Sequence, residues 1–395
     1  INSANSGTIS LAFSGADNDI SGSSSDILLG LTGINDYIGI ATVTTRVTAS
    51  DASDIASKSR AVFSTGIEDN VANLLNSDSS DISSNLQSAL SDDPDANIYL
   101  LESTRSQSAS DIDLIESSTT GSLDLGLVNE ISLISGQNLN LDASTVSGRI
   151  ITFLGSGDDL GETISILGTS AADTIELSNI SVDTNDISTF TIDGGVSGDD
   201  IITGTAGNDI IIGRYGADQI NLIEGGADKI TFMTSGDGAA AGSPTGSDTI
   251  TNFLSNDDEI LVGGNLATAL DGGDQTFDGI VLNTTAGDEQ QIDLTAANTV
   301  EYLFLSKDGT LITAANLVDT TEVATAFEAE VELQNSTVGR DILMAIESTT
   351  TGKFGIYYFA DTDLNPGTID PEELSVLAVV TADAFSKNYF DYDFG

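Results

Sequence analysis

Short apolar runs separated by polar, glycine-rich stretches dominate the chain, and they follow two different periods. In the first 140 residues, four runs are typical of β-strands: "YIGIATVTTRV", "RAVFSTGI", "ANIYLLES" and "GSLDLGLV". Each run follows a copy of the tripeptide Ser-Asp-Ile, which recurs every 27 to 30 residues at Asp26, Asp54, Asp81 and Asp111. A repeat of this length predicts a solenoid, whose units bury their apolar faces against their neighbours.

The segments that begin at these tripeptides predict short helices between the strands. Ser and Asp side chains accept hydrogen bonds from the free amides of a first helical turn, so "SDIASKS", "SDISSNLQSAL" and "SDIDLIES" are expected to be capped helices. "SDILLGLTG" fits better as a loop or a degenerate copy. Residues 1–140 are therefore predicted to form a solenoid of strands and short helices. The alternative is chance recurrence of Ser and Asp, which are abundant here.

The second pattern has a period of nine and runs from residue 195 to residue 232. Its apolar positions are isoleucines, each of which stands two residues after an aspartate, and each aspartate stands two residues after a glycine. The glycines are Gly198, Gly207, Gly216 and Gly226, the aspartates are Asp200, Asp209, Asp218 and Asp228, and the isoleucines are Ile202, Ile211, Ile220 and Ile230. Gly195, Gly204 and Gly213 fill the first position of three units. This arrangement is a worn form of the nonapeptide G-G-x-G-x-D-x-U-x.

The nine-residue unit predicts how the aspartates lie in space. Six residues form a turn that uses glycine where φ is positive, and three form a short strand whose middle side chain points inward. Two units complete one coil, so Asp200 should lie beside Asp218, and Asp209 beside Asp228. Carboxylates about 5 Å apart repel by about 3 kcal/mol at an effective dielectric constant of 20. Calcium, which takes six to eight oxygen ligands, would reverse this repulsion; unrelated Gly-Asn-Asp hairpin turns are the alternative.

A second candidate site lies near the end of the chain, in "GIYYFADTDLNPGTIDPEELSVLAVV" (355–380). Two apolar strands flank an acidic loop that resembles an EF-hand calcium loop, with Asp361, Asp363 and Asn365 at the first ligand positions. Glu373 is the last ligand if Pro366 is an insertion, and Glu372 takes that place otherwise. A solvated acidic turn without an ion is the alternative. The strands predict a C-terminal antiparallel β module over residues 261–395.

Charge and composition narrow the function. The chain has 395 residues, of which 62 are acidic and 11 basic, for a net charge of −51. Such a field makes nucleic acid and anionic membranes poor partners and divalent cations the first partners to expect. Hydrophobic residues make up 39% of the chain, so we expect it to fold.

Missing residue types exclude several classes of enzyme. Cysteine, histidine and tryptophan are absent, which excludes disulfides, thiol nucleophiles, zinc sites with histidine and serine–histidine triads. So many acids make any carboxylate pair uninformative as a glycosidase signature, and we predict that the protein is not an enzyme. The sequence begins with Ile and shows neither a signal peptide nor an apolar run long enough to span a membrane. We therefore expect either a processed fragment or an export signal elsewhere.

Residues 195–232 resemble the RTX family, whose calcium-binding β-rolls occur in proteins exported by bacterial type I secretion. "SDTITNFLSNDDEI" (247–260) is similar to the block that closes such rolls. Residues 141–177 resemble the β-rich repeats that lead into rolls in RTX surface-layer proteins, with Asp159 and Asp173 at aspartate positions although Ala171 replaces a glycine. The final "YFDYDFG" is similar to an export signal, or is simply the last strand.

The resemblance implies a mainly β protein with short helices in three parts. These are a strand and short-helix solenoid (1–140), a β-solenoid and parallel calcium β-roll with its closing block (141–260), and the C-terminal module (261–395). It implies a calcium-loaded, extracellular structural protein that assembles with itself into a bacterial surface layer, with cell-surface polysaccharide as a further candidate partner. A calcium-dependent adhesin or a subunit of an extracellular filament is the alternative.

Overall fold

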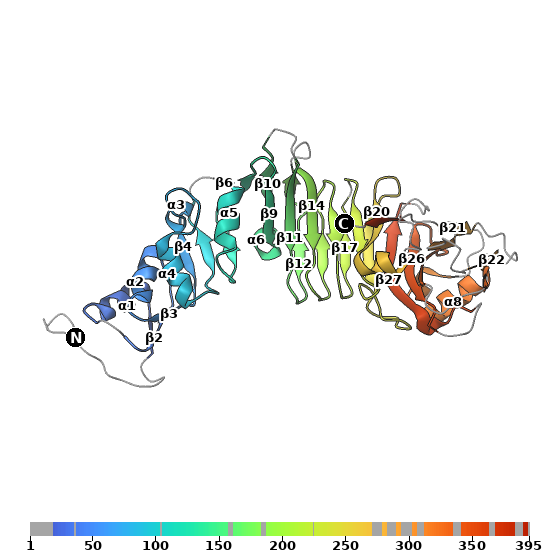
Figure 1. Ribbon diagram of the computed structural model, residues 1–395, viewed down its shortest axis with the longest axis horizontal. Coiled ribbons are helices and arrows are strands. Elements are labelled where there is room, and N and C mark those ends of the chain that lie inside the picture. The colour runs from blue at the N-terminus through green and yellow to red at the C-terminus, as the bar shows by residue number, and fades with distance from the viewer. Residues whose placement is uncertain are drawn as a thin grey trace. The chain divides into compact units, whose positions relative to one another are not determined.

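The structure is a computed structural model that is mainly β, with 37% strand and 21% helix. It describes residues 19–34, 37–102, 105–156, 161–182, 187–223, 225–270, 279–282, 290–293, 302–305, 312–334, 341–362, 368–383 and 390–393. The chain divides into two compact units (Figure 1). Unit 1 comprises Ile1–Val146, Ile150–Glu162 and Asn185–Ile187, and unit 2 comprises the remainder. No helix among the described residues combines the length and hydrophobicity needed to cross a membrane.

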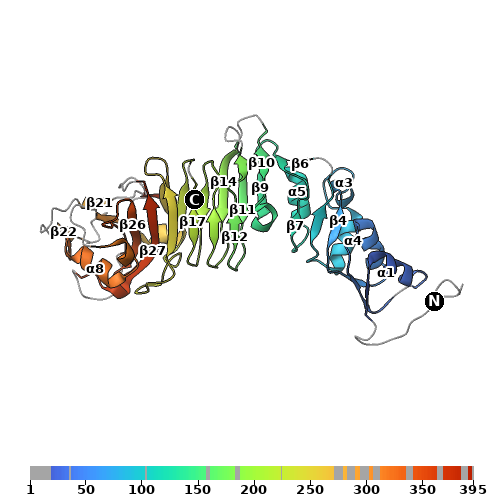
Figure 2. The same cartoon turned by 180° about the vertical axis from the view of Figure 1, so that it is seen from behind.

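Unit 1 is built from short parallel strands with helices between them. Most of its strands form three groups of parallel strands. The first group is β1 (Ile20–Gly22), β2 (Ile40–Val43) and β3 (Arg60–Phe63), and the second is β4 (Ile67–Asp69), β5 (Ile98–Leu100) and β7 (Leu123–Asp124). The third is β6 (Ser106–Ser108), β8 (Glu130–Ser132) and β10 (Ile151–Leu154), and β9 (Asn138–Asp142) also lies in this unit. The helices are α1 (Ser24–Leu31), α2 (Ala49–Ala56), α3 (Val71–Leu74), α4 (Ser84–Asp92), α5 (Ala109–Glu116) and α6 (Ala143–Val146). Helices α1, α2 and α4 lie side by side in both views (Figure 2). The predicted alternation of strands and short helices is confirmed.

The Ser-Asp-Ile tripeptides do not cap these helices, contrary to our prediction. The side chains that cap α1, α2, α4 and α5 belong to Ser23, Thr48, Ser83 and Ser108. "SDILLGLTG" is not a loop, because α1 occupies most of it. The shared feature of three of the tripeptides is instead a fully buried isoleucine (Ile27, Ile55 and Ile112). The repeat therefore marks an inward-facing helical position, and the caps lie two to five residues upstream where the tripeptide falls within a helix.

Unit 2 contains two parallel sheets whose strands alternate along the chain over residues 168–263, a region we call the stacked coils. One sheet includes β12 (Thr174–Glu176), β15 (Ile201–Thr203), β17 (Gln219–Asn221) and β19 (Asp248–Phe253). The other includes β14 (Ile187–Asp193), β16 (Ile210–Ile212), β18 (Lys229–Phe232) and β20 (Glu259–Gly263). Strand β11 (Glu162–Leu167), which precedes the stacked coils, pairs with β14 in this second sheet. Ile202, Ile220 and Ile250 pair in register across the first sheet, as Ile211, Ile230 and Ile260 do across the second. All six isoleucines are buried, which confirms the predicted coil of two units.

The C-terminal part of unit 2 continues these sheets. Strand β27 (Leu374–Ala382) pairs parallel with β19, and it pairs antiparallel with β26 (Lys353–Ala360), which pairs antiparallel with β25 (Asp341–Glu347). The prediction of an antiparallel module is wrong for the other strands: β21 (Gly279–Leu282), β23 (Tyr302–Leu305) and β25 pair in parallel, and so do β22 (Gln290–Asp293) and β24 (Val331–Gln334). Two helices, α7 (Gly264–Leu270) and α8 (Thr320–Glu328), and two 3-10 turns, η3 (Ala314–Asn316) and η4 (Pro371–Glu373), complete this part. The final strand β28 (Phe390–Asp393), which lies in the tail that resembles an export signal, pairs parallel with β20.

Candidate metal centre

Aspartates form two ladders along the two edges of the stacked coils, and all of them are buried except the half-buried Asp173. On the first edge the backbone N–H of Asp173 donates to Oδ1 of Asp200 (2.8 Å), that of Asp200 to Asp218 (2.8 Å), and that of Asp218 to Asp248 (2.9 Å). On the second edge the backbone N–H of Asp209 donates to Oδ1 of Asp228, and that of Asp228 donates to Oδ1 of Asp258, each at a distance of 2.9 Å. The predicted neighbours, Asp200 with Asp218 and Asp209 with Asp228, are therefore confirmed.

Three members of the ladders were not among the predicted metal-site residues: Asp173, Asp248 and Asp258. Asp248 and Asp258 both lie in the block that closes the coils. Asp248 does follow a Gly-x, Gly246-Ser247, but it stands 20 residues after Asp228 and therefore falls outside the period of nine, whereas no Gly-x precedes Asp258. Each is nonetheless followed two residues later by a buried isoleucine, Ile250 or Ile260. The signal that finds every ladder residue from Asp173 onward is thus Asp-x-Ile, in which the isoleucine fixes the strand and the aspartate ends the turn.

The turns that lead into the aspartates are of two kinds, and the second residue after the preceding strand separates them. In three turns this residue has a left-handed backbone: Gly195 (φ 112°), Arg214 (φ 72°) and Ile223 (φ 55°). They precede Asp200, Asp218 and Asp228 respectively. A residue with positive φ orients the neighbouring backbone N–H and C=O groups differently from a residue with the usual negative φ. We call these three the open turns.

In the closed turns, the residue four places before the aspartate donates its backbone N–H to the carboxylate. The backbone N–H of Thr169 donates to Oδ2 of Asp173, and that of Thr205 donates to Oδ2 of Asp209; each donor–acceptor distance is 2.6 Å. Each threonine hydroxyl adds a second hydrogen bond of 2.8 Å to the same carboxylate. Leu254 closes the turn of Asp258 in the same way, with its N–H 2.7 Å from Oδ2. These carboxylates are satisfied by their own turns.

The open turns leave one carboxylate oxygen without a partner. Oδ2 of Asp200, Asp218 and Asp228 is buried and, within the described structure, accepts no hydrogen bond. Burial raises the pKa of Asp218 to about 7 and that of Asp228 to about 8, and it also raises the pKa of Asp200; the neighbouring ladder carboxylates add to each shift. An ionised carboxylate with an unpartnered buried oxygen is costly unless a cation compensates it.

Backbone carbonyl oxygens line the space between each of two open turns, those of Asp218 and Asp228, and the turn stacked before it in the same ladder. A Cβ atom added to Gly216 would collide with the carbonyl oxygen of Gly198 and would lie 3.0 Å from Oδ1 of Asp218. A Cβ atom on Gly226 would likewise meet the carbonyl of Gly207 and lie 2.9 Å from Oδ1 of Asp228. The four glycines predicted as metal-site residues thus bring carbonyl and carboxylate oxygens together, which is the donor set that calcium prefers.

One glycine assignment needs correction, because the turn before Asp200 is one residue longer than the turn before Asp218. Gly194, and not Gly195, is the first residue of that turn. A Cβ atom on Gly194 would lie 2.5 Å from Oδ2 of Asp200, and one on Gly213 would meet Oδ2 of Asp218 in the same way. Gly195 instead occupies the second, left-handed position. Counting back in steps of nine from Gly213 reaches Gly195, one residue after the glycine that begins the turn.

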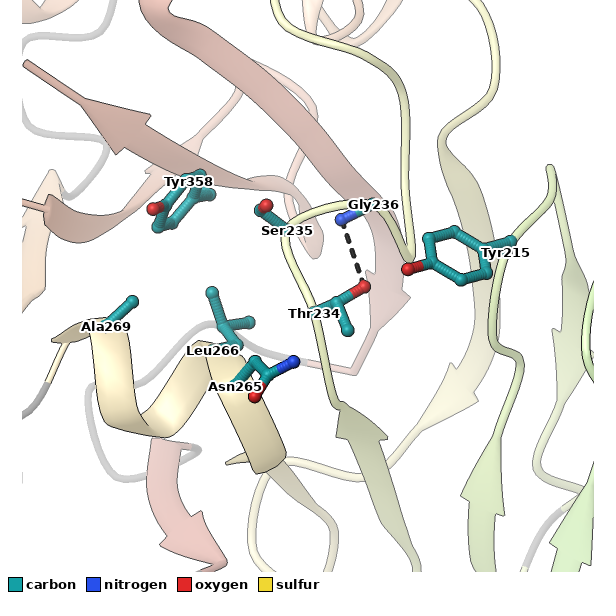
Figure 3. A pocket seen from close by; sticks show the side chains of 8 residues that line it. All are labelled: Tyr215, Thr234, Ser235, Gly236, Asn265, Leu266, Ala269 and Tyr358. Carbon is teal, nitrogen blue, oxygen red and sulfur yellow. Dashed lines mark hydrogen bonds between the residues drawn. The ribbon is translucent and has the colours of Figure 1, made fainter. Parts of the chain in front are cut away.

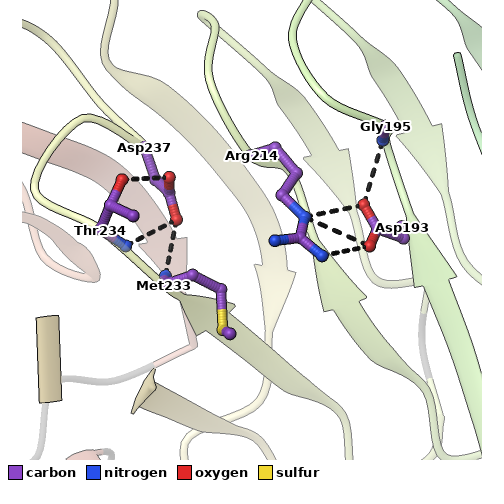
Figure 4. A network of polar contacts seen from close by, with 6 residues as sticks. All are labelled: Asp193, Gly195, Arg214, Met233, Thr234 and Asp237. Atoms are coloured by element: carbon purple, nitrogen blue, oxygen red, sulfur yellow. Dashed lines mark hydrogen bonds and ion pairs between the residues drawn. The ribbon is translucent and has the colours of Figure 1, made fainter. Parts of the chain in front are cut away.

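Arg214 places a fixed cation beside the open turn of Asp218 (Figure 4). Its Nη2 lies 2.6 Å from Oδ2 of Asp193, and its Nε lies 3.0 Å from Oδ1. Hydrogen bonding to Asp193 raises the pKa of Arg214. In the following coil, Asp237 accepts hydrogen bonds from Met233 and Thr234 (Figure 4). The guanidinium therefore joins two coils without occupying the ladder.

The acidic loop near the C-terminus is described only in part. Asp361 and Glu373 are both buried, and Oε1 of Glu373 accepts hydrogen bonds from the backbone and the hydroxyl of Thr362, at 2.6 and 2.8 Å. Glu373 therefore lies next to the residue that follows Asp361, while its role as the last ligand stays a prediction. Two of the predicted ligands, Asp363 and Asn365, lie outside the described residues.

The open turns fit calcium better than a metal that needs many side-chain ligands. Within the described ranges, no three acidic side chains converge as a ready metal site. An ion in an open turn would therefore be held by the unpartnered Oδ2 of Asp200, Asp218 or Asp228, with glycine carbonyls supplying further oxygens. Calcium accepts such a mixture of carboxylates and carbonyls, whereas zinc favours nitrogen and sulfur ligands. No protein-family model matches the chain, and a search of the curated proteins finds no match.

Proposed function

We propose that the stacked coils are a calcium-binding β-roll of the RTX type. The observation that carries the proposal is the set of three buried, unpartnered carboxylate oxygens, one in each open turn, in turns whose glycines bring carbonyl and carboxylate oxygens close together. The net charge of −51 favours divalent cations in general. Sites with a dissociation constant near 10⁻⁴ M would each add roughly 1.4 kcal/mol at millimolar calcium, the concentration found outside cells.

The protein is then an extracellular structural protein that folds where calcium is plentiful and assembles with itself into a bacterial surface layer, exported by type I secretion. Repetition supports this role, since unit 1 and the stacked coils are built from short elements that recur along the chain. Ions that neutralise acidic faces would also let copies with the same large charge approach one another. An adhesin or filament subunit remains the alternative, and an enzyme is not proposed.

Two measurements test the proposal. In the first, protein stripped of calcium is titrated with calcium by calorimetry while circular dichroism follows its folding. We expect binding to be coupled to an increase in β structure; folding that is indifferent to calcium would contradict the proposal. In the second, electron microscopy is performed with calcium and again after a chelator. A planar lattice that dissolves on chelation supports the surface layer, whereas a fibre supports the filament.

A further inference from the structure

A hollow of about 430 Å³ opens on unit 2, and no ladder aspartate lines it (Figure 3). Helix α7 and the ring of Tyr358 face each other across it, and the loop of Thr234, Ser235 and Gly236 closes one side. Tyr215 lies beyond this loop, with its hydroxyl directed toward it (Figure 3). The volume falls in the range of small-molecule sites, roughly 300 to 1,000 Å³.

The two tyrosines are held in place by contacts of their own. The hydroxyl of Tyr358 donates to Oδ2 of Asp341 over 2.5 Å, so its oxygen remains available to the hollow as an acceptor. The ring of Tyr215 lies on Gly236, where a Cβ atom would lie 2.5 Å from Cε1 of the ring. Tyr215 is nonetheless 49% exposed, a large fraction for so large a ring.

The other residues that line the hollow contribute both apolar surface and polar groups. Leu266 and Ala269 present aliphatic carbon from α7. Two polar side chains, the Ser235 hydroxyl and the Asn265 amide, have no hydrogen-bond partner among the described residues and together offer both donors and acceptors. Binding sites for small molecules show this composition, in which apolar walls supply contact and a few polar groups fix orientation.

The charge of the lining selects the ligand. Among the described residues, no lysine, arginine, aspartate or glutamate lines the hollow. A phosphate or carboxylate would find no basic partner there, and a metal ion would find no carboxylate. What fits is a neutral molecule with hydroxyl groups around its rim and C–H groups on its faces, because hydroxyls can pair with Ser235, Asn265 and Tyr358 while C–H faces pack on tyrosine rings.

We propose that this hollow, bounded by Tyr358, α7 and the 234–236 loop, binds one neutral sugar residue of a glycan. The inference goes beyond calcium-dependent assembly and requires neither a lattice nor an ion in the hollow. A weak site of this kind would gain strength from repetition, since an ordered array of copies engages a polymeric glycan at many points.

Saturation-transfer NMR on the full chain in calcium buffer provides the test, with the methyl glycosides of glucose, galactose, mannose and rhamnose as probes. We expect transfer to at least one glycoside with a millimolar dissociation constant. Ala269→Trp should fill the hollow and abolish transfer, while Thr268→Trp, an exposed change on the same helix outside the lining, should leave it intact. Asn265→Ala should weaken binding about tenfold, the loss of one or two hydrogen bonds.

Three outcomes would overturn the proposal. The first is no transfer to any glycoside from protein whose circular dichroism still responds to calcium, so that failure here is distinct from failure of the calcium sites. The second is transfer that survives Ala269→Trp, which would place the sugar elsewhere. The third is that tetramethylammonium binds to the wild type when no glycoside does, and that the Ala269→Trp variant no longer binds it. The hollow would then be a cation site on its tyrosine rings.

Discussion

Two neighbouring turns of the stacked coils have the same length and differ in how they treat the same carboxylate. The turn 204–209 and the turn 213–218 both begin with glycine, carry a second glycine in fourth place and end with a buried aspartate. In the first, Thr205 satisfies Asp209 with two hydrogen bonds. In the second, Arg214 adopts φ 72° and Oδ2 of Asp218 is left without a partner. The second residue of the turn therefore decides whether the aspartate is self-sufficient or available to an ion.

The largest expected effect comes from neutralising the open turns. We predict that the double variant Asp218→Asn/Asp228→Asn loses most of its calcium binding, and that its free energy of unfolding at millimolar calcium falls by about 3 kcal/mol, near the sum of two sites. Calorimetry and denaturant titration measure the two quantities. The matched control is Asp209→Asn in a closed turn. Equal loss of calcium binding in Asp209→Asn would remove the distinction between the turns.

Removing calcium with a chelator should destabilise the stacked coils of unit 2 and leave unit 1 folded. With calcium removed, we expect amides in 195–232 to exchange rapidly with deuterium, because bare carboxylates repel across the ladders. Amides in α4 and α5 of unit 1 should keep their protection. Hydrogen exchange with mass spectrometry follows both regions in one experiment. Protection that persists in 195–232 after chelation would contradict a role for calcium in folding.

A buried acid outside the coils should respond to pH and not to calcium. Glu116 in α5 accepts hydrogen bonds from the backbone of Asp142 and the hydroxyl of Thr145, its Oε2 has no partner among the described residues, and burial raises its pKa to about 7. The carboxylates of Asp142 and Asp113 add to this shift.

The sign of the pH dependence follows from that shift. Because the folded pKa lies above the unfolded value of 4.5, the folded protein holds the extra proton between pH 4.5 and 7, and stability decreases as pH rises through this window. The full effect is roughly 3 kcal/mol. Glu116→Gln should remove it, so the variant should match the wild type near pH 4.5 and exceed it at pH 8. Exchange of the amides in 109–116 reports the difference; identical profiles at both pH values would refute it.

Exchanging the second residues of the two turns tests the comparison directly, with a smaller effect. Thr205→Gly should free Asp209 and raise calcium binding at the second edge, whereas Arg214→Thr should close the turn of Asp218 and lower it. We expect changes of about 1 kcal/mol in the stability at millimolar calcium, the contribution of one site. Calcium titrations of the two variants should move in opposite directions. Movement in the same direction would show that the second residue does not control the turn.

The smallest expected effect is that of the ion pair beside the open turn. Asp193→Asn removes the partner of the half-buried Arg214 guanidinium and should reduce stability by about 1 kcal/mol, while leaving the number of calcium ions bound unchanged. Lys229→Gln, which breaks the more exposed pair with Glu259, is the control and should have almost no effect. A change in calcium stoichiometry in Asp193→Asn would mean that this carboxylate is itself a ligand.

The sequence predicts the stacking of the ladders because the spacing of aspartate and isoleucine fixes the length of each coil. Ile202 pairs with Ile220, and Asp200 with Asp218, as the period requires. The difference between open and closed turns could not be predicted in the same way. Arg214 and Ile223 adopt left-handed conformations that are unfavourable for residues with a side chain, so composition alone does not reveal them.

Helix caps and strand directions were predicted less well, for physical reasons. The abundance of serine let Ser23 and Ser108 take capping roles close to the tripeptide serines, and burial of Ile27 and Ile112 fixed the helix positions. In the C-terminal part, apolar runs predict strands but not their direction. Strand β23 pairs parallel with β25 because α8 and β24 lie between them along the chain, and such a long connection allows a parallel crossover.

The central claim is that an ion binds where the turn leaves a carboxylate oxygen bare and not where a threonine satisfies it. Anomalous scattering from crystals grown in calcium tests this directly. The account predicts calcium peaks within coordination distance of Oδ2 of Asp200, Asp218 and Asp228, and none at Oδ2 of Asp209. Open turns without a peak, or a peak at Asp209 as strong as that at Asp218, would contradict it.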